Sequence, residues 1–132
     1  MRRSGLLHAE LNRVIAAMGH TDTLVIADVG LPVPHDVPCI DLAVLPGTPS
    51  FAAVFNAVYA ELAVESVTLA REIHERNPAL VALSRRLAGD GLTVDEVSHD
   101  ELKQLTARAV AVVRTGETAP YANVILHAGV TF

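Results

Sequence analysis

A histidine and an aspartate eight positions apart are the first candidates for chemistry in this sequence. His20 lies in the polar segment 19–23, between two strongly apolar segments, and Asp28 directly follows the apolar run 24–27. An imidazole titrates near neutral pH and can both give and take a proton, while a carboxylate can orient it or hold a hydroxyl group. The spacing alone does not decide between such an acid–base pair and a solvated turn histidine followed by an aspartate that merely ends a strand.

Three further side chains have the chemistry to bind a neutral polyol. His99 stands in the first turn of an expected helix, where the helix dipole favours a neutral imidazole that donates one hydrogen bond and accepts another. Tyr121 and Asn123 flank Ala122 beside a proline turn and offer a ring face, a hydroxyl, a donor and an acceptor. Each of these residues is also ordinary in a solvated helix start or a loop.

The motifs of the common cofactors and metals are missing from the sequence. There is no pair of histidines at i, i+4, no Cys-x-x-Cys, no Walker loop and no G-x-G-x-x-G. These absences argue against a structural zinc site and against nucleotide binding. We therefore expect a site that works without metal or cofactor.

Charge and cysteine content bear on partners and location. The net charge of −5 argues against nucleic acid and anionic membranes as partners. Cys39 is the only cysteine, so no intrachain disulfide can form, as fits a reducing compartment. No apolar run approaches the length of a membrane span. We expect a cytoplasmic protein.

The elements that would position the candidate residues alternate between helix and strand. Apolar residues at helical spacing, with caps, predict helices over 7–18, 48–62, 71–76, 77–88 and 98–108. Apolar or alternating runs predict strands over 24–27, 39–45, 92–97, 109–113 and 123–126. The segment 64–69 fits either state, and Thr48 followed by Pro49 reads as the cap and first residue of its helix. The alternation indicates one α/β domain over residues 1–132.

The composition indicates that the chain associates with copies of itself. The hydrophobic fraction is 51% and only 19% of the residues are charged. A small domain has much surface to cover, so this balance suggests apolar surface buried between subunits. The tail Val130-Thr131-Phe132 is a candidate for such a contact.

Five short motifs in order resemble the D-ribose pyranase family, which belongs with the fucose mutarotases. Together they run from the end of the first expected helix to the last residue. They are Gly19-His20-Thr21-Asp22-Thr23, Asp28 with Gly30-Leu31-Pro32, Gly116-Glu117, Pro120-Tyr121-Ala122-Asn123, and Ala128-Gly129-Val130-Thr131-Phe132.

The resemblance implies a three-layer α/β/α fold with a mixed sheet, and pentameric rings of subunits paired into a decamer. It implies an active site close to a subunit contact, and interconversion of the pyranose and furanose forms of D-ribose without metal or coenzyme. By the family pattern His20 is the catalytic acid, and Ala122 contributes only backbone. The residues expected to bind the sugar are Asp28, His99, Tyr121, Ala122 and Asn123.

This chemistry suits an imidazole. A change of ring size needs a proton delivered to the ring oxygen while the anomeric hydroxyl loses one, and His20 can serve both transfers. Asp28 is expected either to orient His20 or to hold a sugar hydroxyl. Two alternatives stay open: a fucose-type mutarotase that interconverts anomers, and a non-catalytic sugar-binding oligomer.

Overall fold

A six-stranded mixed sheet forms the centre of the protein, in a computed structural model that describes residues 1–132. The strands lie in the order β2-β5-β1-β6-β3-β4, and only β6 runs antiparallel to its neighbours, β1 and β3. Their bounds are β1 Thr23–Ala27, β2 Cys39–Asp41, β3 Val64–Ala70, β4 Thr93–Val97, β5 Ala111–Arg114 and β6 Val124–Ala128.

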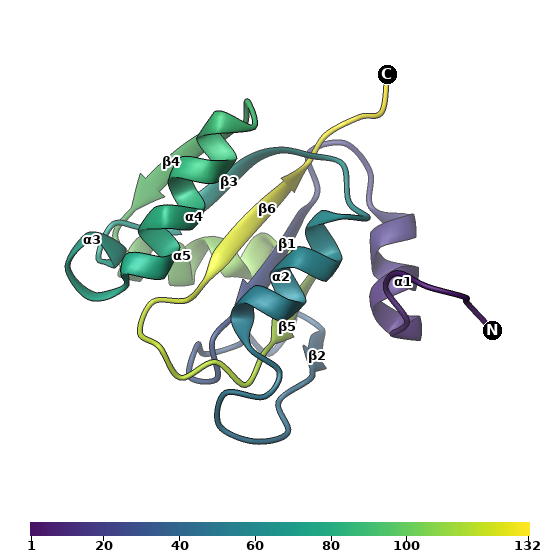
Figure 1. Cartoon of the computed structure of the whole chain (residues 1–132), viewed down its shortest axis with the longest axis horizontal. Helices are drawn as coiled ribbons and strands as arrows, with labels where there is room; N and C mark the ends of the chain where they lie inside the picture. The colour runs from purple at the N-terminus through teal and green to yellow at the C-terminus, as the bar shows by residue number, and fades with distance from the viewer.

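Helices cover both faces of this sheet, as Figure 1 shows. They are α1 Ala9–Ala17, α2 Phe51–Tyr59, α3 Ile73–Arg76, α4 Pro78–Gly89, α5 His99–Leu105 and the short 3-10 helix η1 Thr106–Arg108. Alternate residues of β1 point to opposite faces: Leu24 and Ile26 pack with α1, α2 and α4, whereas Val25 and Ala27 pack on the side of α5. The expected three-layer α/β/α architecture with a mixed sheet is confirmed.

The helix starts follow from local hydrogen bonds at the caps. The Asn77 side chain accepts from the backbone N–H of Leu80 at 3.1 Å, with Pro78 as the first helical residue. Ser98 accepts from the N–H of Glu101 at 3.1 Å at the start of α5. Side-chain oxygens of this kind satisfy backbone donors that have no partner inside the helix, so these starts were readable from the sequence.

The predicted start of α2 was wrong. Ser50 caps this helix by accepting from the N–H of Ala53 at 3.1 Å, so Thr48 lies outside it. Thr48 instead forms a bridge with Leu45, and the carbonyl of Pro49 accepts from the N–H of Gly116 at 2.8 Å. The tight turn between Leu45 and Thr48 and the long-range bond from Gly116 keep the chain out of the helix until Ser50.

Two strand predictions changed in extent. The strand expected over 39–45 ends at Asp41, because the Asp41 carboxylate takes the N–H of Ala43 at 3.0 Å and turns the chain away from the sheet edge. The ambiguous segment 64–69 is the strand β3, whose last four residues are buried between β6 and β4.

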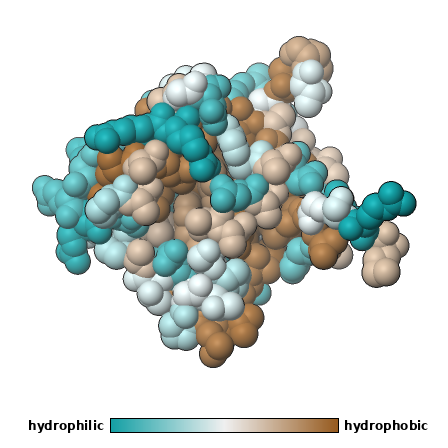
Figure 2. Space-filling view, in the orientation of Figure 1, coloured by the Kyte–Doolittle hydropathy of each residue, from teal (hydrophilic) through white to brown (hydrophobic).

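Part of the surface is apolar. The large exposed apolar side chains are Met1 and Leu7 before α1, Val44 and Leu45 in the loop between β2 and α2, and Val130 and Phe132 in the tail. Figure 2 shows apolar surface at this loop and at the C-terminal end. None of the helices has the length and apolar character needed to cross a membrane.

His127 is a half-buried histidine within the sheet. Its Nε2 lies 3.0 Å from Oγ1 of Thr68 on the neighbouring strand β3. Burial lowers the pKa of His127 below its ordinary value, against the opposing effect of the Asp95 and Glu65 carboxylates. Below pH ~6.5 the imidazole of His127 is protonated more readily in the unfolded chain than in the folded one, and this difference favours unfolding. The free energy of unfolding therefore keeps its full value above pH ~6.5 and decreases as the pH falls toward the pKa of His127 in the folded protein.

We expect His127→Gln to flatten the pH dependence of stability. Urea unfolding at about pH 7.5 and about pH 5.5, at one protein concentration, should give a smaller loss of unfolding free energy for the variant than for the unsubstituted chain. His35→Gln, in an exposed loop, removes a histidine without touching the sheet and serves as the control. An equal loss of unfolding free energy in the His127 variant and the unsubstituted chain would contradict the lowered pKa of His127.

Candidate active site

Most of the expected sugar-binding residues gather at one edge of the sheet. Asp28 follows β1 and His99 follows β4, while Asn123 precedes β6, whose antiparallel direction brings its start to the same edge. Crevices beyond the carboxyl ends of parallel strands are the usual ligand sites of α/β sheets. The fold therefore assembles these residues where a ligand site is expected.

Asp28 and Asn123 are locked together by two hydrogen bonds. Asn123 Oδ1 accepts from the backbone N–H of Asp28 at 2.8 Å, and Asn123 Nδ2 donates to Asp28 Oδ2 at 3.0 Å. Asp28 Oδ1 accepts from the N–H of Gly30 at 2.9 Å. The Asn123 side chain is completely buried, and both of its amide atoms bind Asp28. These bonds fix the carboxylate of Asp28 at the edge of the sheet.

His99 and Tyr121 meet edge to face beside an acidic residue. Their ring centroids are 5.0 Å apart at an interplanar angle of 77°. Glu72, which follows β3, accepts from the backbone N–H of His99 through Oε2 at 2.8 Å. Glu72 Oε1 and His99 Nδ1 are buried without a hydrogen-bond partner. Buried polar atoms are rarely left unpaired, so this place suits a polar ligand.

Ala122 can reach a ligand only through its backbone. Its methyl group is buried in the core, whereas no hydrogen bond within the chain uses its N–H or carbonyl. The preceding residue, Tyr121, has φ 59°, a left-handed conformation that is uncommon outside glycine. Strain of this kind tends to persist at functional sites.

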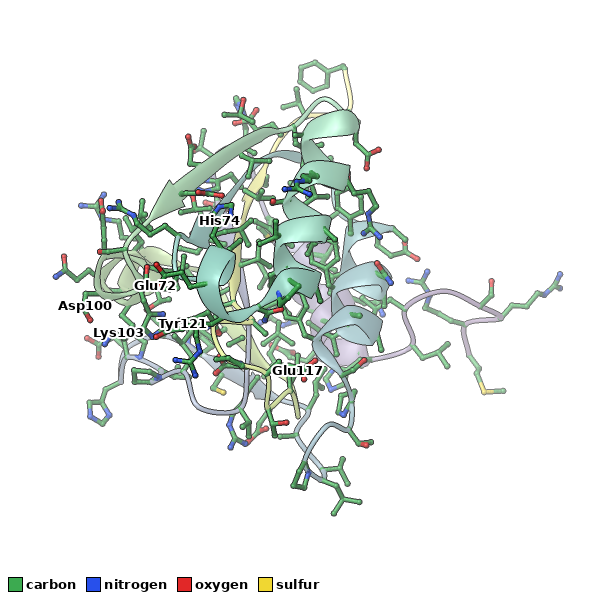
Figure 3. All side chains as sticks on the ribbon, turned by 60° about the vertical axis from the view of Figure 1, so that its left-hand side comes forward. Glu72, His74, Asp100, Lys103, Glu117 and Tyr121 are labelled. Atoms are coloured by element: carbon green, nitrogen blue, oxygen red, sulfur yellow. The ribbon has the colours of Figure 1, made fainter.

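Lys103, the only lysine of the chain, lies one helical turn after His99 and is paired with an aspartate. Its Nζ is 2.9 Å from Oδ1 of Asp100, and that contact holds the pKa of the Asp100 carboxyl below its usual range. Figure 3 shows Glu72, Asp100, Lys103 and Tyr121 gathered on one side of the molecule, away from Glu117. One cation and two carboxylates therefore lie on the same side of the molecule as the Tyr121 ring.

His20 lies at the opposite end of the sheet. Its neighbour Thr21 donates its N–H to the carbonyl of Ala128 at 3.0 Å, at the end of β6, whereas Asp28 binds Asn123 just before the start of that strand. The five residues of β1 separate the two ends by ~16 Å, at about 3.3 Å per residue. Asp28 therefore cannot orient His20 within one chain, and that part of the sequence-based expectation was wrong.

The residue that contacts His20 is Glu65, which the sequence did not single out. His20 Nε2 lies 3.0 Å from Glu65 Oε2, and both side chains are about half exposed, at 51% and 47%. Glu65 lies within the segment 64–69, whose secondary structure the sequence left ambiguous, and Glu72 follows it. The one signal in the sequence for Glu72 was an acidic residue just after a strand, as at Asp28. No signal in the sequence pointed to Glu65.

An apolar groove of about 300 Å³ lies between α2 and α4. It is lined chiefly by apolar residues such as Phe51 and Phe55, and of the expected site residues it includes Ala122 but neither His20 nor Asp28. A neutral polyol is recognised by converging hydrogen-bond groups, so the polar edge is the better candidate. No cluster of three or more His, Cys, Asp or Glu side chains is arranged to hold a metal ion.

Comparison with known proteins identifies relatives along the whole chain. Residues 1–131 match the RbsD / FucU transport protein family. The chain is 56% identical to a D-ribose pyranase of Symbiobacterium thermophilum and 53% identical to one of Exiguobacterium sibiricum, each over 132 residues and 100% of both chains.

Solved structures agree with the fold. The structure of Bacillus subtilis RbsD complexed with D-ribose superposes with a TM-score of 0.94 at 45% identity, covering 100% of both chains. A fucose mutarotase from Streptococcus pneumoniae in complex with L-fucose has a TM-score of 0.76 at 21% identity, over 96% of this chain and 95% of the other. At that identity the second likeness concerns the fold alone.

Removing the Asn123 amide should destabilise the protein. Asn123→Ala leaves the Asp28 N–H without its hydrogen-bond acceptor, which we expect to cost about 1–3 kcal/mol of unfolding free energy in urea titrations. The control is Asn56→Ala, because Asn56 only accepts from Arg86 at an exposed position, at 3.3 Å, and its loss should change stability by less than about 0.5 kcal/mol. Equal effects of the two variants would contradict the structural role of Asn123.

Proposed function

The chain belongs to the RbsD/FucU family, and we propose that it is a D-ribose pyranase, an isomerase that interconverts the pyranose and furanose forms of D-ribose. The observation that carries this proposal is the full-length identity of 56% to a protein of that name. The likeness to RbsD, which was solved with D-ribose, supports the same sugar. The proposal treats residues 1–132 as one sugar-mutarotase domain. It places the protein in the cytoplasm, because a single cysteine fits a reducing compartment.

The sugar-binding part of the site is proposed at the edge that holds Asp28. The Asp28 carboxylate is fixed by its neighbours but keeps lone pairs that can accept from a hydroxyl. The unpaired Glu72 Oε1 and His99 Nδ1 can take further hydroxyl groups, and the Tyr121 ring can cover a sugar face. The proposed ribose ligands are Asp28, His99, Tyr121, Asn123 and the backbone of Ala122.

The proton-transferring residue is proposed to be His20. His20 delivers a proton to the ring oxygen as the bond between that oxygen and the anomeric carbon breaks, and it takes up the proton that the anomeric hydroxyl loses, which leaves an open-chain aldehyde. A different sugar hydroxyl then attacks the aldehyde carbon and gives its proton to His20, while His20 returns a proton to the carbonyl oxygen. Atoms and protons balance over the cycle, so one imidazole that returns to its starting state is sufficient.

A complete site then needs two copies of the chain. His20 and Asp28 lie at opposite ends of β1, so one sugar can meet both only if the His20 end of one subunit faces the Asp28 edge of another. Such a contact joins two different surfaces, and repeated contacts of this type form a ring when the rotation between subunits closes. This arrangement is compatible with the proposed pentameric rings paired as a decamer. The exposed Val130 and Phe132 are available for such contacts.

Magnetisation-exchange NMR on D-ribose tests the activity. The protein should accelerate exchange between pyranose and furanose signals, and His20→Ala should lower that rate by about 10²–10⁴-fold. His35→Ala, in an exposed loop, is the control and should exchange ribose normally. Acceleration of fucose anomers only would favour the mutarotase alternative, and binding of ribose without exchange would favour a non-catalytic sugar-binding protein. Full activity of His20→Ala would exclude His20 as the proton carrier.

Mixing two inactive variants tests the shared site. If each site takes His20 from one subunit and Asp28 from its neighbour, hetero-oligomers formed by co-expressing His20→Ala and Asp28→Ala should have about a quarter of their sites intact. Co-expression of His20→Ala with the double variant should recover nothing. Intact hetero-oligomers without recovered activity would mean that both residues act within one subunit, and an active Asp28→Ala variant on its own would show that Asp28 is dispensable.

A further inference from the structure

Glu65 is the carboxylate closest to the proposed proton carrier, and we propose that it is a positioning residue that orients the His20 ring by accepting from Nε2–H. The inference rests on the proposed role of His20. A neutral imidazole that donates from Nε2 to a carboxylate keeps its Nδ1 lone pair free. Glu65, at 3.0 Å from Nε2, would therefore direct Nδ1 toward the sugar as the atom that gives and takes the proton.

A break in the strand register makes Glu65 available for this contact. Val64 pairs with Ala128 and Ser66 pairs with His127, so two steps along β3 correspond to one step along β6. Glu65 is the extra residue of this bulge and has no partner in the ladder. Bulges frequently re-aim a side chain beside an active site, and here the re-aimed side chain reaches His20.

Backbone hydrogen bonds hold the two side chains together at the end of β6. The N–H of Thr21 donates to the carbonyl of Ala128 at 3.0 Å, and the N–H of Ala128 donates to the carbonyl of Asp22 at 2.9 Å, which fixes the His20 loop. The N–H of Gly129 donates to the carbonyl of Ala63 at 2.8 Å, which fixes the start of β3. Three distant segments thus meet around one His–Glu pair.

Gly129 leaves the space that Glu65 occupies. A Cβ on Gly129 would lie 3.1 Å from Cβ of Glu65 and 3.4 Å from its backbone nitrogen, so a side chain there would crowd Glu65. Asp22, the nearest carboxylate in sequence, is engaged elsewhere, because its Oδ2 accepts from the N–H of Gly19 at 2.8 Å. Glu65 is therefore the residue that this part of the fold directs at His20.

A structural role explains this arrangement poorly. Half-exposed ion pairs contribute little to the free energy of folding. A pair that served stability alone would need neither a bulge at Glu65 nor a glycine at position 129 to make room for it. The chain holds a second pair of the same type, His74 Nε2 to Glu96 Oε1 at 2.7 Å, between α3 and β4. It provides a matched control for the loss of a surface His–Glu contact.

Ribose exchange kinetics of Glu65 variants test the inference. Glu65→Ala should lower kcat by about 10–100-fold, the loss seen when a carboxylate that orients a metal-bound histidine is removed, and should leave KM nearly unchanged. Glu65→Gln keeps an acceptor for Nε2–H and should retain more activity than Glu65→Ala. Glu96→Ala should exchange ribose at the normal rate. Sedimentation of each variant shows whether assembly is preserved.

The ring ¹⁵N spectrum of His20 in the unsubstituted protein gives a readout that needs no variant. Signals of the neutral form should place the ring proton on Nε2, and a proton mainly on Nδ1 would overturn the inference. Wild-type kcat in Glu65→Ala, with His20→Ala inactive, would also overturn it while leaving the proposed function intact. Full activity of His20→Ala would instead overturn the role of His20 itself.

Discussion

The antiparallel pairing of β6 between β1 and β3 is the contact on which both ends of the molecule depend. Just before this strand starts, the buried amide of Asn123 binds both the backbone and the carboxylate of Asp28. At its other end, Ala128 binds the loop that carries His20. Because β6 is the one strand that runs against its neighbours, its start lies where β1, β3 and β4 finish. A single strand thus connects the two groups of proposed functional residues.

That arrangement separates the residues that one reaction would need. The five-residue length of β1 keeps His20 and Asp28 apart, and no local rearrangement of side chains spans that distance. In the proposed mechanism a monomer therefore presents two incomplete halves, one with the proposed proton carrier and one with the proposed sugar-binding residues. Association of copies is then a chemical requirement of the proposed reaction, beyond its effect on exposed apolar surface such as Val130 and Phe132.

Hydrogen-bond satisfaction distinguishes scaffold from ligand site. Both amide atoms of Asn123 bind Asp28 within the chain, so the Asn123 side chain holds the proposed sugar-binding carboxylate in place. Glu72 Oε1 and His99 Nδ1 are buried and unused, which is costly unless a ligand pairs with them. The two non-glycine residues with positive φ, Thr21 at 74° and Tyr121 at 59°, each lie beside a proposed functional residue. Strain and unpaired polar atoms therefore mark the same places that the motifs indicated.

The sequence by itself determined the local structure and the candidate residues. Caps such as Asn77 and Ser98, together with apolar periodicity, located most helices and strands, because these signals act between residues close in the chain. Only the tertiary structure decided that α2 starts after Ser50, that 64–69 is a strand, and that His20 meets Glu65 rather than Asp28. These outcomes depend on strand order, direction and a bulge, which arise from pairing between distant segments and leave no periodic trace in either segment alone.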